Sequence, residues 1–231
     1  MTKQNNGCDR CGTCCRKGGP VLHHDDKSIL REGHAGHQHL VTIRKGELAY
    51  DPVYGKLRQV QKEMVRVIGK DDAWSCVFYE EKNAECSVYR NRFLECRLLK
   101  CWDTSGLISV IGKNTIVRAD IINANDPVLE FIRLHEQECP VMEIQKLIAG
   151  LSSAGARQEI LSRIGEFVRR DQSMRAHALT ELGIRKEYEF FIFGRPLTRL
   201  LEDHGLAVRN GDNATSFDLA VQRSEKHGTP D

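Results

Sequence analysis

The stretch Cys8-Asp9-Arg10-Cys11-Gly12-Thr13-Cys14-Cys15 carries four thiols within eight residues. It lies among glycine and polar residues and shows no apolar periodicity, so a hydrophobic core does not account for it. Structural cysteines are usually buried singly and do not cluster in this way. Scattered structural thiols are therefore the weaker interpretation of this stretch, and metal ligation is the stronger one.

A second cysteine-rich stretch runs from residue 76 to residue 101 with the spacing C-x9-C-x9-C-x4-C. A straight helix over residues 86–96 would separate its ends by about 15 Å, whereas two sulfurs on one zinc ion lie within about 4.6 Å of each other. Either the chain breaks within this segment, or its two cysteines serve different sites. The predicted metal ligands of both stretches are Cys8, Cys11, Cys14, Cys15, Cys76, Cys86, Cys96 and Cys101.

Cys14 and Cys15 are adjacent in the chain. Neighbouring side chains usually point apart, so one of these two thiols could face a second site or the core. The flanking residues also bear on the site, because cations near thiols lower their pKa and offset the charge of a thiolate centre. The residues predicted to surround the centre are Arg10, the backbone near Gly12, and Arg97.

The spacing within the first stretch favours iron–sulfur over zinc. C-x2-C-x2-C is the spacing by which bacterial ferredoxins wrap a loop around an iron–sulfur cluster. Zinc sites are commonly built from two C-x2–4-C pairs, and the second stretch, although it ends in a C-x4-C pair, does not as a whole have the spacing of a zinc knuckle. We therefore predict an iron–sulfur cluster as the cofactor, with Zn²⁺ as the alternative.

Composition bounds the class of protein. The chain has 231 residues, of which 40% are apolar and 29% charged, as expected for a globular protein with its own core. The net charge of +2 is too small to argue for nucleic acid, and few aromatic residues lie among the cations, so we expect no nucleic-acid partner. No apolar run approaches a membrane span and no secretory signal is visible, so we expect a cytoplasmic protein without membrane contact. Nine cysteines in a reducing compartment then favour metal over disulfides.

The hydrophobic pattern predicts an α-rich α+β fold, in which an irregular, metal-tied cysteine-cluster domain packs with a helical C-terminal region. The predicted parts are a metal-binding domain over residues 1–102, a helical region over 103–208 and a disordered tail over 209–231. In the first part the pattern predicts a small hairpin from residues 40–43 and 48–50, and a helix over residues 57–68. In the second part, helices are expected to begin at Pro127, Pro140 and Pro196, and Asp171 is expected to cap a further helix.

A loop of histidines offers a possible separate metal site. His34, His37 and His39 could act alone or with His23 and His24, but their spacing matches no particular metal, so this is the weaker interpretation.

His135 and Cys139 would share one face of a helix and could also bind metal. A helix end at Pro140 with a buried single thiol explains the same residues, and we favour that explanation. The chain contains no P-loop, G-x-G-x-x-G or G-x-S-x-G motif, so no motif points to nucleotide binding or to a serine hydrolase.

Taken together, the motifs resemble those of the YkgJ-like cysteine-cluster family, which is described as zinc- or iron-chelating and often labelled Fe–S oxidoreductase. The family pattern is C-x2-C-x2-C-C, then one cysteine, then C-x2-Y-x2-R-P-x2-C-R. This chain has Phe93 where the family has proline, and Cys101 lies outside the pattern. Beyond the first stretch, the matching residues are Cys76, Cys86, Tyr89, Arg92, Cys96 and Arg97.

The match spans roughly residues 8–102 and identifies the family more firmly than it identifies a reaction. We predict a metal-binding protein whose cluster serves electron transfer or redox sensing, with a redox or protein partner that the sequence does not identify. The alternatives are a zinc-stabilised, non-catalytic interaction module and an enzyme with a structural cluster, so the sequence leaves open whether the protein is an Fe–S oxidoreductase.

Overall fold

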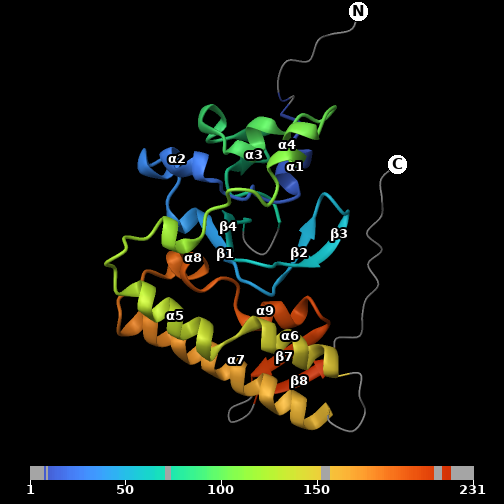
Figure 1. Ribbon diagram of the computed structural model, residues 1–231, viewed down its shortest axis with the longest axis vertical. Helices are drawn as coiled ribbons and strands as arrows, with labels where there is room; N and C mark the ends of the chain where they lie inside the picture. Colours follow the sequence, from blue (N-terminus) through green and yellow to red (C-terminus); the bar gives the residue numbers. More distant parts are fainter. Residues whose placement is uncertain (1–7, 9, 71–73, 152–156, 211–214, 220–231) are drawn as a thin grey trace, which may run out of the picture.

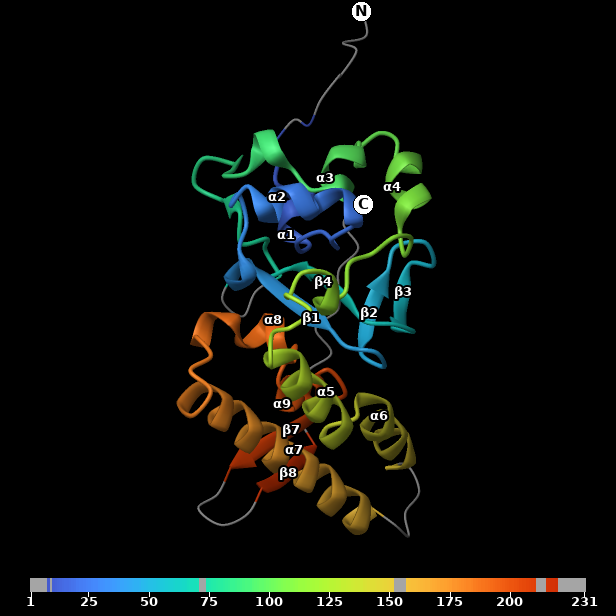
Figure 2. The same cartoon turned by 60° about the vertical axis from the view of Figure 1, so that its left-hand side comes forward.

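A computed structural model of the chain describes residues 8, 10–70, 74–151, 157–210 and 215–219, with only the backbone described for 208–210 and 215–219. The molecule is elongated, with the short elements of the N-terminal half at one end and the longest helices at the other (Figures 1 and 2). The predicted helix-rich α+β fold is confirmed, because helices dominate and the strands form small two-stranded sheets. No helix in the described part of the chain is long and apolar enough to cross a lipid bilayer.

The N-terminal half consists of short elements joined by loops. Its α-helices are α1 (Thr13–Arg16), α2 (Lys27–Arg31), α3 (Leu94–Leu98) and α4 (Ser105–Val110). Its strands are β1 (Leu40–Ile43), β2 (Leu48–Asp51), β3 (Lys56–Gln59), β4 (Met64–Val67), β5 (Tyr79–Glu80) and β6 (Glu85–Cys86). Its 3₁₀ turns are η1 (His24–Asp26), η2 (His37–His39), η3 (Tyr89–Asn91) and η4 (Arg118–Asp120).

The C-terminal half contains the long helices. They are α5 (Val128–Glu138), α6 (Val141–Gly150) and α7 (Arg157–Thr180), followed by η5 (Lys186–Tyr188), α8 (Glu189–Phe193) and α9 (Leu197–Glu202). Two strands close the described chain, β7 (Leu206–Asn210) and β8 (Thr215–Leu219). Helices α5, α6 and α9 begin directly after Pro127, Pro140 and Pro196, as the sequence predicts.

The pairing of the N-terminal strands differs from the prediction. Strand β1 pairs with β4, so that Leu40 lies opposite Val67, and β2 pairs with β3, so that Tyr50 lies opposite Leu57. The predicted hairpin of residues 40–43 with 48–50 and the predicted helix over 57–68 are therefore wrong. Apolar residues in the 57–68 window fall at helical spacing by coincidence, whereas within β4 burial alternates with the period of two that a strand requires.

Two further predictions fail in the C-terminal half. Helix α7 continues through Asp171, which lies in its middle and does not cap a second helix. Strands β7 and β8 pair antiparallel, with Leu206 opposite Leu219, so part of the predicted disordered tail is a hairpin. Residues 211–214 and 220–231 of that tail lie outside the described residues.

The hydrophobic core has two clusters. The larger one joins β1 and β4 to the cysteine-containing loops and continues into α5 and α8, and it contains both Phe93 and Phe193. The smaller one joins α6, α7 and α9 around Ile164 and Leu201. The larger cluster thus connects the two ends of the molecule, because side chains from both halves contribute to it.

Buried ion pairs join the same two halves. The Arg44 side chain, at the end of β1, is 0% exposed; its Nε lies 3.0 Å from the Glu136 carboxylate on α5, and it also donates to the Cys139 carbonyl. The Arg118 side chain is 2% exposed. Its Nη2 donates to the Glu136 carboxylate at 2.6 Å and also to the Glu63 carboxylate. Glu136 therefore bridges the guanidinium groups of Arg44 and Arg118. Among the described residues of α5, no other carboxylate pairs with either of them.

A second buried network surrounds Asp171 in the helical half. Its Oδ1 accepts hydrogen bonds from His135 Nε2 at 2.7 Å and from Arg175 Nε at 2.9 Å, and its Oδ2 accepts one from the backbone N–H of Leu197 at 3.1 Å. Burial alone would raise the pKa of Asp171, but His135 and Arg175 outweigh it and hold the pKa at about 2. Asp171 is therefore ionised and ties α5, α7 and α9 together.

Replacing Asp171 with asparagine should destabilise the protein by about 3 kcal/mol at neutral pH, because it removes one of the two buried carboxylates that pair with Arg175, the other being Glu189, and weakens the hydrogen bond with His135. The pKa of Asp171 is lower in the folded than in the unfolded state, so its contribution is present above about pH 4 and is lost as the pH falls towards about 2. Urea denaturation across this range should show the difference between wild type and Asp171→Asn narrowing in acid.

Glu143→Gln provides the control, because Glu143 pairs with Arg163 between α6 and α7 at the surface, where both side chains are about half exposed. This variant should change the free energy of unfolding by less than about 0.5 kcal/mol. Equal destabilisation by both variants would contradict the role assigned to the buried network.

Candidate metal centre

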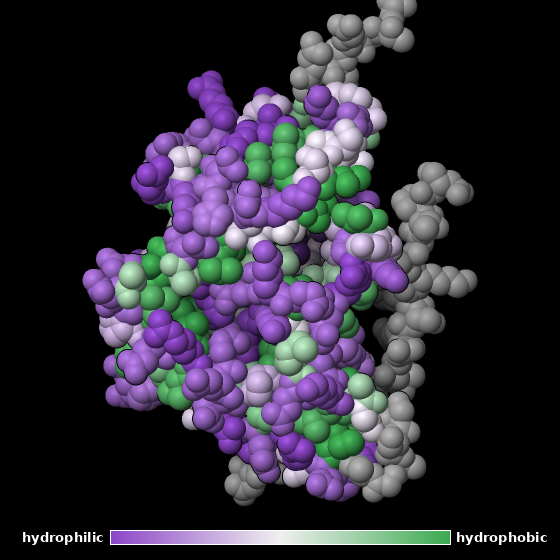
Figure 3. All heavy atoms as spheres, in the orientation of Figure 1, coloured by the Kyte–Doolittle hydropathy of each residue, from purple (hydrophilic) through white to green (hydrophobic). Residues whose placement is uncertain are grey.

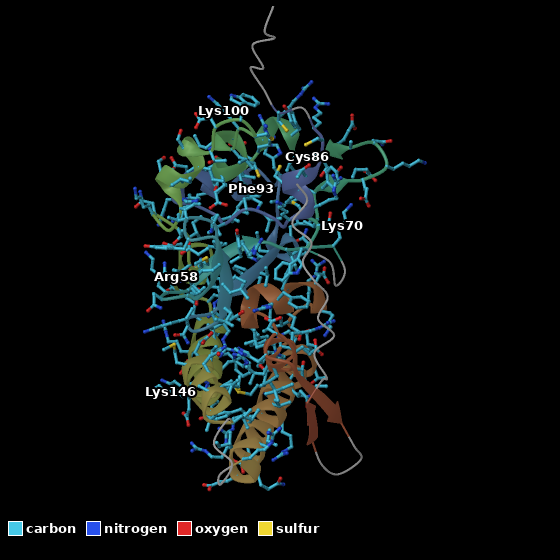
Figure 4. The ribbon with its side chains drawn as sticks, turned by 90° about the vertical axis from the view of Figure 1, so that its right-hand side faces the viewer. Arg58, Lys70, Cys86, Phe93, Lys100 and Lys146 are labelled. Carbon is cyan, nitrogen blue, oxygen red and sulfur yellow. The ribbon has the colours of Figure 1, made fainter. Side chains whose placement is uncertain are left out.

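All eight cysteines predicted as ligands line one cavity of about 170 Å³ at the N-terminal end of the molecule. They reach it from the loop before α1, from α1 itself, from the segment around β5 and β6, and from α3 and the residues after it. Figure 4 shows Cys86 and Phe93 in this end of the molecule, remote from Lys146 on the long helices. The ninth cysteine, Cys139, does not line the cavity.

The first cysteine stretch turns sharply at Gly12. This residue precedes α1 with a φ of 75°, in the left-handed region that glycine tolerates. A Cβ at this position would lie 1.9 Å from the Tyr79 hydroxyl, so no larger residue fits. Arg16 secures the turn by donating hydrogen bonds to the Tyr79 hydroxyl and to the Cys11 carbonyl, both at 3.1 Å.

The turn directs both adjacent thiols into the cavity. The sulfurs of Cys14 and Cys15 lie 4.0 Å apart, and both residues line the cavity. Neither residue is turned away from the cavity, and Cys15 also packs against the larger core cluster, as expected for one of the two. A single helical turn, α1, places consecutive residues about 100° apart, which is close enough for both to reach one enclosed space.

Backbone hydrogen bonds attach the second stretch to the first. The N–H of Cys76 donates to the carbonyl of Cys15 at 2.8 Å. Downstream, Cys86 in β6 lies opposite Tyr79 in β5, which is the residue that covers Gly12. These contacts bring thiols separated by some sixty residues to one cavity without a large sheet beneath them.

The chain breaks between Cys86 and Cys96, which resolves the distance problem raised by the sequence. After the turn η3, Arg92 and Phe93 are extended, and α3 begins at Leu94. Asp26 fixes the start of α3, because its Oδ1 accepts the N–H of Leu94 at 2.7 Å.

Phe93 occupies the position where the family pattern has proline. Its φ is −59°, within the range that a proline ring imposes, so the turn is retained without proline. The side chain is 2% exposed and packs near Phe78, with ring centroids 6.0 Å apart. The backbone at this position is therefore one that proline could also adopt.

The thiols differ in their electrostatics. The hydrogen bond between the Cys11 sulfur and the Thr13 hydroxyl, 3.4 Å apart, lowers the pKa of Cys11. The contact between the adjacent thiols lowers the pKa of Cys14 to about 6 and raises that of Cys15, which keeps its proton. Burial raises the pKa values of three others, Cys76, Cys86 and Cys96, and neighbouring cysteines add to this effect.

These pKa shifts show that the cavity, without a metal, disfavours the ionised form of most of its thiols. Several thiols crowd into a poorly solvated space, so they cannot all ionise without a compensating positive charge. A metal cation supplies such a charge and binds the thiolate form. The donor set therefore fits a soft, thiolate-binding metal or cluster.

The surroundings predicted from the sequence are present only in part. Arg10 lines the cavity, its backbone N–H lies 3.3 Å from the Cys8 sulfur, and Gly12 also lines the cavity. Arg97 does not line it, since its side chain donates to the Arg92 carbonyl at 2.8 Å and lies 4.0 Å from Asp26. Arg97 therefore braces the loop rather than facing the sulfurs.

Arg92 matches the family pattern but was not among the residues predicted to surround the centre. It lines the cavity, it lowers the pKa of Cys86, and its Nε is buried without a hydrogen-bond partner among the described residues. The Tyr89 ring is enclosed between two guanidinium groups, Arg92 at 4.1 Å and Arg10 at 4.3 Å from the ring centroid. The Y-x2-R portion of the family pattern was the available signal for this arrangement.

The structure does not bring the loop histidines together as a metal site. His37 stacks on Phe191 with centroids 4.5 Å apart, and His39 packs against Phe78 at 4.9 Å. His34 lies 3.3 Å from Glu32 at the surface. At least two of the three are therefore packing residues.

The described residues contain one group of three ligand-type atoms within 4.8 Å of one another, formed by His135, Cys139 and Asp171. Both Asp171 oxygens already accept hydrogen bonds, and the positive charge of the Arg175 guanidinium beside them would repel a metal cation. Cys139 is 0% exposed, and burial raises its pKa to about 12. This group is a buried hydrogen-bond network, consistent with a helix ending before Pro140 and a buried thiol.

Comparison with known families gave one match. The model described as "CxxCxxCC: Putative zinc- or iron-chelating domain" matches residues 7–140, which is more than half of the chain and extends from the first cysteine stretch to the end of α5. Searches of curated proteins and of solved structures gave no match.

Replacing Arg92 with glutamine should weaken metal retention about 10- to 100-fold, because it removes a cation that lines the cavity and favours the thiolate form of Cys86, and whose buried Nε has no hydrogen-bond partner among the described residues. Competition with a chelator measures this, whichever metal is bound. Arg90→Gln is the matched control, because Arg90 is an exposed arginine two residues away. Similar metal loss from both variants would show that Arg92 has no special part in the site.

Proposed function

Because the chain belongs to the CxxCxxCC family of zinc- or iron-chelating domains, we propose that its cysteine cavity holds an iron–sulfur cluster used for electron transfer or redox sensing. Metal binding follows from the family, and the nature of the metal is the proposal. The proposal rests mainly on the spacing of the thiols in the cavity.

The spacing of the thiols is the observation that carries this choice. Four sulfurs bound to one zinc ion at about 2.3 Å lie within about 4.6 Å of one another. Among the described residues no three cysteine sulfurs come within 4.8 Å of each other, although all eight cysteines line the cavity. A cluster several atoms across holds its thiolates at separate corners, so it accepts a wider donor set than a single ion does.

The walls of the cavity support the same choice. Phe78, Val88 and Leu99 contribute apolar surface, and the Arg92 guanidinium adds a positive charge beside it. Burial and hydrogen bonding around the sulfurs are the means by which a protein sets the potential of an iron–sulfur centre, and such a centre exchanges single electrons. Eight thiols also exceed the four that one cubane cluster needs.

The cysteines form a protected group and an accessible group. Cys76 is buried, and Cys14, Cys15, Cys86 and Cys96 are partly shielded. Cys11 and Cys101 are exposed at the rim of the cavity. The shielded thiols are the better candidates to hold the cluster, while the rim is where a redox partner would approach it.

Protein produced and purified without oxygen should be brown, contain iron and acid-labile sulfide, and lose its visible absorption on reduction with dithionite. Exposure to air should release iron. Colourless protein with stoichiometric zinc under the same conditions would overturn the redox proposal and leave a zinc-stabilised interaction module.

Substitutions test the ligand assignment independently of the metal. Cys14→Ser and Cys96→Ser should each reduce metal content and lower the stability of the N-terminal half, because each removes a thiolate from the cavity. Cys139→Ser should leave metal content unchanged, since Cys139 is buried in the other core cluster. Metal analysis of the three proteins decides this, and equal losses would contradict the assignment.

A further inference from the structure

Exposed apolar side chains gather on the hairpin formed by β2 and β3. Tyr50 is 65% exposed, Val53 49%, Tyr54 62% and Leu57 61%. Tyr50 and Leu57 lie directly opposite each other, so they form one apolar cross-strand pair on a face that solvent reaches. This is the largest sequence-local group of exposed large apolar residues among those described.

The hairpin has no third strand. In the described structure β2 pairs with β3 alone, and β3 pairs with β2 alone. An isolated two-stranded hairpin is marginally stable in water, and its outer edges present unpaired backbone groups. An extended segment from another protein could therefore add to either edge, with its side chains lying against the exposed pair.

The hairpin and its flanks are positively charged. Four exposed cations lie on the hairpin and its flanks, while Asp51 is the one acid there that is not turned inward; it is partly exposed and lies 3.1 Å from Arg58. The other two acids of the region are turned inward, Glu47 towards Arg195 and Glu63 towards Arg118. The four cations are Lys45, Lys56, Arg58 and Lys62.

The hairpin lies near helix α4, which contributes Leu107 to the lining of the cysteine cavity. In Figures 1 and 2 its tip is near α4, and in Figure 3 apolar surface lies above the hairpin, at the level of α4. Ile108 on α4 is 44% exposed and Trp102 is 51% exposed, while Leu107, between them, lines the cavity. Arg58 extends from the side of the molecule in Figure 4.

We propose that the β2–β3 hairpin is a docking surface for a protein partner that presents an extended, acidic segment with interspersed apolar residues. Tyr50 and Tyr54 offer rings on which bases could stack, but the two free strand edges offer backbone groups that an extended peptide matches and a nucleic acid does not, so a protein partner is favoured over single-stranded nucleic acid. The surplus of cations disfavours a second copy of this chain, because two such hairpins would repel each other. A partner bound here would lie beside the rim of the cavity, but its binding does not require any particular metal.

The test is a selection of peptides of about twelve residues from a random displayed library on the full-length protein. Selected peptides should be enriched in aspartate and glutamate over the input library. A resynthesised peptide should bind at least about tenfold more weakly to Tyr50→Ser/Leu57→Ser and to Lys56→Glu/Arg58→Glu. Its affinity should also fall as salt rises from about 50 to about 500 mM.

Leu134→Ser/Leu182→Ser is the matched control, because these leucines are 45% and 49% exposed on α5 and after α7. This variant should bind the peptide as wild type does, and circular dichroism should confirm that every variant is folded. Metal content measured on the same preparations separates a failure of docking from a failure of the metal proposal.

Three results would overturn the inference. Selected peptides without acidic enrichment, or with affinity unchanged by the hairpin variants, would remove the docking role. Hairpin-dependent binding of a uridine oligonucleotide, with no peptide selected, would assign the surface to nucleic acid. A concentration-dependent dimer abolished by the hairpin variants would assign it to a second copy of the chain.

Discussion

Glu136 accepts hydrogen bonds from two arginines that are almost completely buried, Arg44 and Arg118, and the arrangement of the whole molecule depends on this bridge. Arg44 lies at the end of β1, Arg118 follows the strands of the N-terminal half, and Glu136 belongs to α5. A buried charge without its partner is costly, so the three side chains have to meet. Their meeting fixes β1 and β4 against the helices, and the cysteine-bearing loops attach to that platform.

The cavity itself has little regular structure to support it. It is held by local constraints: a left-handed glycine under Tyr79, a backbone hydrogen bond from Cys76 to Cys15, and a carboxylate, Asp26, at the start of α3. Each constraint positions one cysteine-bearing segment, and none of them uses a thiol. These three constraints therefore do not compete with metal ligation by the sulfurs, and a bound metal would add its own cross-links to the framework that they form.

The sequence predicted the cysteine cavity better than it predicted the fold around it. The eight thiols could be recognised because their clustering has no other physical explanation, whereas the pairing of β1 with β4 depends on contacts between residues far apart in the chain. Asp171 was misread for a related reason. Aspartate is common at the start of a helix, but the partners of Asp171, His135 and Leu197, belong to other helices, so the neighbouring sequence gives no sign of them. The role of Arg92 was likewise hidden, because a buried, unpaired Nε is a property of the folded cavity.

Phe93 illustrates what the proline of the family pattern is for. The backbone at this position keeps a φ of −59°, while the side chain has become part of the core beside Phe78. The torsion angle required at this position can therefore be adopted by more than one residue type. A relative without this proline would not match a search for the sequence pattern. It would match a search for this backbone dihedral angle together with a cysteine three residues further on.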